Sequence, residues 1–463
     1  MRVLSLSALI AAALACQSAS AITLPVDVCT DSTVPSDNTL RHVLTRAQSG
    51  DVVDIHQCSS LALVGPVSIP SSINNLTIRG GATADAVVIA SARGVAFSDF
   101  STGTVTFSGL TVTGASGTNQ YYSCIESAGS VTLSSSKVID CSIHQPQYFG
   151  AVSQAAGITA VGNVTLQSSE ISENVVYARS NQAVHGVGIQ AGSISLIDSK
   201  VSGNVAEGAK SVSGVGLFSK GLFAGDSVIS GNVSIYIAAS KGAGAYVTDG
   251  NAIIKYSTIA NNSSDRNSAL VVTSSSPATP TSLTLLNSTI TGNRSGGSGT
   301  VGSYGATAVY NSTIANNDVR YSRANAPTGL SSGGTTTLSS SIISNNSAYI
   351  GSEYQFYAPS SGGTVGGSNN LIGFSSTPLP QDTLSSCPRL GTLAMNGGPT
   401  PTLALLPGSP AIDHGIANNL TADQRESPFG RSAGLAPDIG AFELQSNEKL
   451  DQIFVSRFDG ACR

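Results

Sequence analysis

The chain has 463 residues, a net charge of −5 and only 22 basic residues, and 11% of its residues are charged. A charge-poor, slightly acidic chain lacks the basic footprint of a nucleic-acid-binding protein, so we expect no nucleic-acid partner. Hydrophobic residues make up 40% of the sequence, which is too high for a disordered Ser/Thr-rich stalk.

Residues 1–21 have the pattern of a secretory signal peptide. Arg2 provides the positive start, an apolar run follows up to Ala15, and Ala19-Ser20-Ala21 is a small-residue cleavage site. Cys16 leaves lipidation open as an alternative. No later stretch is long and apolar enough for a transmembrane helix. The sequence therefore predicts a secreted or cell-surface protein.

Residues 22–73 are predicted to form an N-terminal cap that contains an amphipathic helix at 39–50. Thr39 can cap the helix start and Gly50 can stop it. One face of this helix is apolar, which suits a segment that covers the open end of a larger core. The residues on that face are Leu40, Val43, Leu44 and Ala47.

Residues 74–375 contain a repeat that ends each time in an Asn-containing turn, as in SSEISEN at 168–174 and NSTITGN at 287–293. Successive closing asparagines are 30, 28, 30, 31, 24 and 29 residues apart. A nearly fixed period in this range indicates a stacked repeat architecture. The closing asparagines are Asn174, Asn204, Asn232, Asn262, Asn293, Asn317 and Asn346.

Each repeat consists of short alternating segments rich in Ser, Thr, Ile and Val, which is typical of strands and turns. We therefore predict an all-β, single-stranded, right-handed parallel β-helix with an N-terminal helical cap and an irregular C-terminal cap. The recurring Asn can adopt a left-handed corner conformation, and its side-chain amide can hydrogen-bond from coil to coil. A β-propeller is the main rival fold, but the short units and the absence of Trp argue against it.

Six cysteines follow the signal segment, and an even number in an exported chain suggests disulfides. Nearest-neighbour pairing would join 29 to 58, 124 to 141 and 387 to 462, although six cysteines allow 15 connectivities. The spacings are too long for a zinc site. The candidates are Cys29, Cys58, Cys124, Cys141, Cys387 and Cys462.

Residues 376–446 differ from the repeats because stiff Gly/Pro turns and charged residues are concentrated there. Arg425 can pair with Asp438 and so fasten an irregular cap. A calcium site at Asp413, Asp423 and Asp438 is the alternative, because calcium prefers oxygen ligands. Residues 447–463 form a C-terminal tail.

Three parts of the chain resemble known bacterial secreted proteins, and one of them is NNLTIRGGATADAVVIAS at 74–91, which is similar to their opening coil. TLRHVLTRAQSGDVVDI at 39–55 resembles the CSLREA region, with His42 in place of the usual Glu. NGGPTPTLALLPGSPAIDHG at 396–415, TADQRESPFGR at 421–431 and PDIGAFE at 437–443 are similar to the choice-of-anchor Q domain. The resemblance implies a secreted β-helix protein of the pectin-lyase-like kind. The tail resembles those of some exported Gram-negative proteins, which implies a bacterial and Gram-negative source. The family supplies no catalytic residues.

The sequence contains none of the polygalacturonase or pectate lyase motifs. We therefore expect a non-catalytic surface protein that binds a glycan, a matrix component or a partner protein. A polysaccharide lyase or glycoside hydrolase is the alternative. Outward residues of successive coils align, so a stripe of lysines and tyrosines could bind an anionic glycan. The candidate binding residues are Tyr121, Tyr122, Tyr148, Tyr177, Lys210, Lys220 and Lys241. We expect no cofactor other than the calcium considered above.

Overall fold

A computed structural model gives the fold of the chain. It describes residues 21–32, 38–81, 86–90, 94–114, 122–144, 154–179, 181–237, 239–265, 268–296, 299–320, 327–348, 354–357, 365–446 and 448. The predicted signal segment and most of the tail lie outside these residues. Within them, no helix is long and apolar enough to cross a bilayer.

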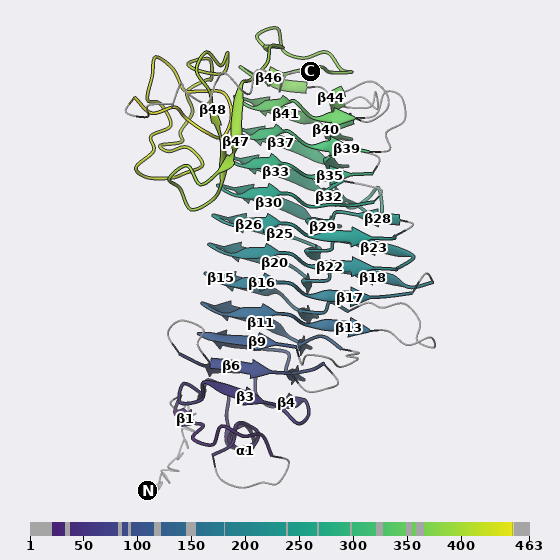
Figure 1. The fold of residues 1–463 in the computed structure, drawn as a ribbon, viewed down its shortest axis with the longest axis vertical. Helices are drawn as coiled ribbons and strands as arrows, with labels where there is room; N and C mark the ends of the chain where they lie inside the picture. The colour runs from purple at the N-terminus through teal and green to yellow at the C-terminus, as the bar shows by residue number, and fades with distance from the viewer. Residues whose placement is uncertain are drawn as a thin grey trace, which may run out of the picture.

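Three long parallel sheets run along a single solenoid, and the chain visits them in the same order in every coil (Figure 1). Each strand hydrogen-bonds to the equivalent strand of the next coil, in register. The predicted parallel β-helix is therefore confirmed.

Sheet 1 has 13 strands among the described residues. They are β1 (Thr23–Pro25), β2 (Val52–Asp54), β5 (Asn75–Arg79), β8 (Thr104–Ser108), β11 (Ser130–Ser134), β15 (Val164–Gln167), β20 (Ile194–Ile197), β25 (Leu222–Gly225), β30 (Asn251–Lys255), β33 (Ser282–Leu286), β37 (Ala306–Tyr310), β41 (Thr336–Ser339) and β45 (Val365–Ser368). Because β2 pairs with β5, the solenoid begins before residue 74, where the sequence placed its start.

Sheet 2 follows sheet 1 in each coil. Its strands are β3 (Ser60–Ala62), β6 (Ala86–Ile89), β9 (Leu110–Thr113), β12 (Lys137–Ile139), β16 (Glu170–Ser172), β21 (Lys200–Ser202), β26 (Val228–Ser230), β31 (Thr258–Ala260), β34 (Thr289–Thr291), β38 (Thr313–Ala315), β42 (Ile342–Ser344) and β46 (Leu371–Ile372).

Sheet 3 completes the coil before the chain returns to sheet 1. Its strands are β4 (Val67–Ile69), β7 (Phe97–Asp99), β10 (Ile125–Ser127), β14 (Ile158–Ala160), β19 (Ile189–Gln190), β24 (Leu217–Ser219), β29 (Ala245–Thr248), β32 (Leu270–Thr273), β36 (Val301–Ser303), β40 (Pro327–Ser332) and β44 (Tyr354–Tyr357).

Short additional sheets lie between sheets 2 and 3. One contains β13 (Ser142–His144), β17 (Val175–Tyr177), β22 (Val205–Glu207) and β27 (Val233–Ile235). A second contains β18 (Ala183–His185), β23 (Ser211–Ser213) and β28 (Ala239–Lys241), and a third contains β35 (Arg294–Ser295), β39 (Asp318–Val319) and β43 (Ser347–Ala348).

The core consists of aliphatic side chains that stack from coil to coil. Leu133, Leu166 and Leu196 are in register in sheet 1, and all three are fully buried. Alternate residues of each strand point outward, as the period of a β-strand requires. The inward aliphatic positions expected from the repeat are therefore confirmed.

The closing asparagines form a buried ladder inside the solenoid. The Nδ2 group of Asn204 donates to Oδ1 of Asn232 at 2.8 Å, and that of Asn232 donates to Asn262 at 2.9 Å. The backbone N–H of each of these residues also donates to the next Asn side chain. The expected hydrogen bonding from coil to coil is confirmed.

The left-handed conformation expected for these asparagines belongs instead to the residue before them. Glu173, Gly203 and Asn261 have φ values of 59°, 65° and 57°. The preceding residue makes the corner, and this leaves the Asn side chain free to point inward and join the ladder.

A second ladder, formed by serines, fills the corner between sheets 1 and 2. The backbone N–H of Ser136 donates to Oγ of Ser169, and that of Ser169 donates to Oγ of Ser199, both at 3.1 Å. These serines recur in the repeat, but serine is so common in this sequence that their structural role could not be predicted from it.

The helix α1 (Leu40–Arg46) covers the N-terminal end of the solenoid and packs against β2 and β4. Thr39 caps it by accepting a hydrogen bond from the His42 N–H. Leu40 and Val43 are buried as predicted. The helix is shorter than expected, because it already ends at Ala47 in an extended conformation, and Gly50 lies in the following turn.

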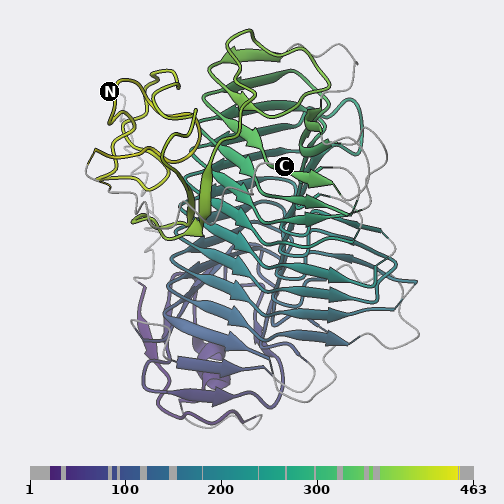
Figure 2. The same ribbon diagram turned by 45° about the horizontal axis from the view of Figure 1, so that its top comes forward.

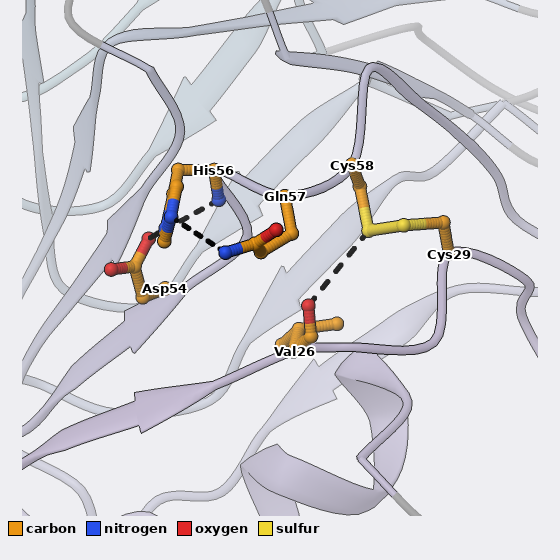
Figure 3. Close-up of a disulfide and its surroundings, with 6 residues drawn as sticks. All are labelled: Val26, Cys29, Asp54, His56, Gln57 and Cys58. Carbon is orange, nitrogen blue, oxygen red and sulfur yellow. Dashed lines mark hydrogen bonds and ion pairs between the residues drawn. A yellow bond between two sulfur atoms is a disulfide. The ribbon is translucent and has the colours of Figure 1, made fainter.

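Two disulfides match the nearest-neighbour pairing. Cys29 is bonded to Cys58, close to the cluster of Asp54, His56 and Gln57 (Figure 3), and Cys124 is bonded to Cys141. Cys387 is also disulfide-bonded. Cys462, its predicted partner, lies outside the described residues.

Residues 390–446, which we call the flank region, lie along the side of the late coils (Figures 1 and 2, yellow-green). They contain the antiparallel pair β47 (Leu390–Ala394) and β48 (Thr402–Leu405) and are otherwise irregular. The outward threonines of sheet 2 hold this region: Thr258 donates to the Pro401 carbonyl, and Thr289 donates to Gln424. The sequence predicted an irregular cap but gave no indication that it covers a flank.

Candidate functional site on the outer face of sheet 3

One row of outward side chains on sheet 3 combines aromatic rings with polar groups, and this combination suits ligand binding. The row consists of one outward position from each of five consecutive strands of sheet 3, β10, β14, β19, β24 and β29, and these positions are in register. We call this row, together with the neighbouring His185, the aromatic face. Its row members are Glu126, Thr159, Gln190, Phe218 and Tyr246.

Stacked rings occupy one half of the aromatic face. The Phe218 and Tyr246 rings lie 5.7 Å apart, with an interplanar angle of only 4°. The His185 ring lies 4.7 Å from Phe218. A left-handed glycine, Gly186 with φ 61°, directly follows β18 and turns the chain toward sheet 3. An added Cβ there would lie 2.2 Å from the Ile189 carbonyl oxygen, so this corner requires glycine.

Three buried polar atoms of the aromatic face have no hydrogen-bond partner among the described residues. They are Oε1 of Glu126, Nδ1 of His185 and Oε1 of Gln190. Buried polar atoms are nearly always paired, so these three atoms are available to hydrogen-bond a ligand or water.

Burial shifts the pKa values of three titratable groups at this face in the direction that favours their uncharged forms. It raises the pKa of Glu126, against a hydrogen bond from the Ser123 backbone, and lowers the pKa of His185. Burial also raises the pKa of Tyr246, with the nearby Tyr304 and Asp249 adding to the effect. The face therefore favours uncharged hydrogen-bonding groups.

The predicted lysines lie around this face, although they do not converge on it. Lys241 ends β28, where it stacks in register with Ser213 and His185. Lys220 lies directly after β24, in the turn toward sheet 1. Lys210 precedes β23, and all three lysines are exposed.

The predicted tyrosines do not form a common platform in the described part of the chain. Tyr177 is on β17 and stacks on His144, with 4.3 Å between the ring centroids. Tyr122 is exposed and lies just before β10. Tyr121 and Tyr148 lie outside the described residues.

The sequence did not single out Phe218, Tyr246, Glu126 or Gln190. Their alternation with buried residues is visible in the sequence, but at least four strands lie between each of them and the next along the chain. Only the coil-to-coil register shows that they share one face.

The charged residues of the flank region form a structural network. Arg425 is buried between the rings of Phe429 and Phe442, each 3.9 Å from its guanidinium carbon. Its ion pairs are with Asp423, at 2.8 Å, and with Glu448. The predicted pair of Arg425 with Asp438 is therefore wrong, because Asp423 lies two residues away on the same turn and reaches the guanidinium first.

The carboxylates of the three aspartates proposed for calcium accept hydrogen bonds from backbone N–H groups. Asp438 accepts hydrogen bonds from the N–H groups of Asp413 and Leu444, and Asp413 accepts one from Leu435. Asp423 accepts from the Glu443 N–H in addition to Arg425. No group of three His, Cys, Asp or Glu residues within the described ranges has the arrangement of a metal site. The structure does not bring these aspartates together as ligands.

Comparison with known proteins adds little to this site. No family model and no curated protein matches the chain. One solved structure, described as a PL6 alginate lyase complex with trisaccharide, is similar over 84% of this chain and 92% of its own, at 12% identity and a TM-score of 0.36. At these values the similarity carries no argument about function.

Proposed function

We propose that this protein is an exported β-helix protein that binds a glycan across the aromatic face of sheet 3. The observation that carries the proposal is the stacked Phe218–Tyr246 pair beside three buried polar atoms without partners. Sugars present apolar faces that stack on rings and hydroxyl groups that satisfy polar atoms, so this combination suits a glycan.

The periodicity of the face supports an extended ligand. Successive coils lie about 4.8 Å apart, so the row from Glu126 to Tyr246 spans about 19 Å. A linear glycan lying along the solenoid axis would place successive sugar units over successive coils. The glycan would then replace the water that otherwise solvates Glu126, Gln190 and His185.

Export is part of the proposal. Two disulfides fit an oxidising compartment, and the signal-like segment at 1–21 and the choice-of-anchor Q-like motifs at 396–443 point the same way. The N-terminal sequence of protein recovered outside the cell would test this: processing before Ile22 supports export, and an intact Met1 contradicts it.

A glycan array followed by calorimetry on any glycan that binds would test the ligand class. The double variant Phe218→Ala with Tyr246→Ala should weaken binding by about tenfold or more, as expected for central aromatic anchors. Phe223→Ala is the matched control, since Phe223 is an outward ring on sheet 1. Equal losses in both variants, or no binding of any glycan by the wild type, would contradict the proposal.

A lyase or hydrolase is the second candidate, and one observation favours it. Burial lowers the pKa of His185, and its Nδ1 has no partner among the described residues, so this side chain is a candidate general base. Incubation with acidic polysaccharides, followed by ultraviolet detection of unsaturated products and by reducing-end assays, separates the two functions. Turnover that disappears in His185→Gln would establish catalysis, and bound but intact polysaccharide would establish binding alone.

A further inference from the structure

The strand β47 of the flank region has an unpaired edge. It forms a two-stranded sheet with β48, so within the described part of the chain one edge of β47 has no neighbouring strand. The partner strand β48 is well covered, because Thr402, Leu403 and Leu405 are buried. A sheet of only two strands is marginally stable by itself, and an exposed edge offers a row of backbone N–H and C=O groups to a further strand.

Both faces of β47 are also uncovered. None of its five residues is buried: Thr392 and Ala394 are exposed, and the other three are half-buried. Strands of the solenoid such as β33 bury alternate residues instead. Met395, which follows β47, is 62% exposed. The strand therefore has space beside its free edge for another segment.

The C-terminal tail begins where β47 ends. β47 runs along the solenoid axis, across successive coils (Figure 1). Just after its last residue, the Asn396 carbonyl accepts a hydrogen bond from Nη1 of Arg425 at 3.2 Å. The same nitrogen forms the ion pair with Glu448. The first residues of the tail are thus held beside the C-terminal end of β47.

A second anchor for the tail lies at the opposite end of β47. Cys387 precedes β47 by three residues and is disulfide-bonded. The other four cysteines of the described residues are bonded to one another, which leaves Cys16 and Cys462 as partners for Cys387. Cys16 lies in the predicted signal segment, so export leaves Cys462 as the partner.

The tail has the length and the composition of a strand that fits between these anchors. Its 14 residue steps from Glu448 to Cys462 reach about 46 Å when extended, whereas the nine steps from Cys387 to Asn396 span at most about 30 Å. The difference leaves enough chain for a turn at each end. The central stretch QIFVSR at 452–457 has three consecutive residues of high β-propensity and contains neither Gly nor Pro.

We infer that the tail segment 452–457 docks on the free edge of β47 as the third strand of that sheet, and that a disulfide between Cys387 and Cys462 holds its far end. The added strand is antiparallel, because the tail begins at the C-terminal end of β47 and finishes at the N-terminal end. Numbering between the two anchors places Phe454 opposite Thr392. This is β-strand addition, with the protein's own chain as the added strand. The inference does not depend on the proposed glycan, because β47 is not part of sheet 3.

Peptide mapping of the exported protein under non-reducing conditions tests the disulfide. A linked pair of peptides that contain Cys387 and Cys462 is expected. The pairs Cys29–Cys58 and Cys124–Cys141 in the same digest are the internal control. A free thiol at Cys462, or a bond from Cys462 to a second copy of the chain, overturns the inference.

Hydrogen exchange at residues 390–394 tests the strand pairing. All of β47 should be protected in the wild type, because the amides that do not face β48 face the tail. Phe454→Pro with Val455→Pro removes one donor from each edge of the tail strand, and exchange at β47 should become about tenfold faster or more. Asp459→Pro with Gly460→Pro makes the same change outside the paired segment and should leave β47 unchanged.

Release of the disulfide separates the tether from the pairing. Cys387→Ser with Cys462→Ser should speed exchange at β47 less than the proline variant, whereas Cys124→Ser with Cys141→Ser should leave β47 unchanged. Fast exchange at half of the β47 amides in the wild type, or no effect of the Phe454/Val455 variant, overturns the inference. Protection of β47 that rises with protein concentration also overturns it, because the edge then pairs with a second copy.

Discussion

The solenoid and the flank region are stabilised in opposite ways. The solenoid repeats one neutral set of interactions, the aliphatic stacks and the Asn and Ser ladders, in coil after coil. The flank region has little regular structure, and interactions that occur only once hold it, including the buried charge network around Arg425 and the hydrogen bonds to the threonines of sheet 2. Damage to a repeated interaction should therefore be shared between neighbouring coils, whereas damage to the network should affect the whole flank region.

The largest effect is expected from Arg425→Ala. It leaves Asp423 buried without its cation, and breaking a buried ion pair in this way costs about 3–5 kcal/mol. Hydrogen exchange should show that the flank region loses protection while the early coils keep theirs. Arg389→Ala is the control, since Arg389 is exposed and makes one hydrogen bond to the Pro407 carbonyl. Uniform destabilisation of both regions would contradict the comparison.

A smaller effect is expected from Asn262→Ala in the middle of the ladder. It removes the acceptor of Asn232 and the donor to Asn293, and each buried polar group left unpaired costs about 1–3 kcal/mol. Thermal unfolding should show the loss, with Asn251→Ala on the exposed edge of β30 as the control. If the two variants unfold alike, the ladder contributes nothing beyond the packing around it.

The pH dependence should also separate the two regions. Burial raises the pKa of Glu443 to about 7 in the folded protein, from an ordinary value of 4.5. The folded state holds this proton more tightly than the unfolded state. The stabilisation that comes from this tighter proton binding at Glu443 is thus complete below about pH 4.5, and it is lost as the pH rises through about 7.

Hydrogen exchange of the flank region at pH 5 and pH 8 would check this. Protection should be greater at pH 5, and Glu443→Gln should reduce the difference. Exchange in the early coils, such as β11 and β15, serves as the internal control. Greater protection at pH 8 in the wild type would show that the two backbone N–H donors to Glu443 outweigh its burial.

The smallest effect is expected from Glu170→Gln on the solenoid wall. Its ion pairs with Lys137 and Lys200 are partly exposed, and such pairs contribute about 0–1 kcal/mol. The midpoint of thermal unfolding should hardly move. A large loss of stability would instead assign these charges a structural role.

The residues that form the aromatic face could not be predicted from the sequence. Lysines and tyrosines stand out in a charge-poor, Ser-rich sequence and therefore suggest a binding surface, but Tyr177 lies on another sheet and stacks on His144. Phe218 and Tyr246 were missed because no sequence motif links them. Strands in register, separated by a whole coil of chain, bring their rings to 5.7 Å.

The sequence by itself determined the β-helix and the Asn ladder, because a period near 30 residues repeats the same local constraints in every coil. It left 15 disulfide connectivities open, and the structure shows two of the nearest-neighbour pairs. Only the tertiary structure decided which residue makes each left-handed corner, where the flank region packs, and which carboxylate pairs with Arg425. These features depend on contacts between segments that occur once in the chain, such as Thr258 with Pro401. A contact made once leaves no periodic signal, so nothing in the sequence repeats to reveal it.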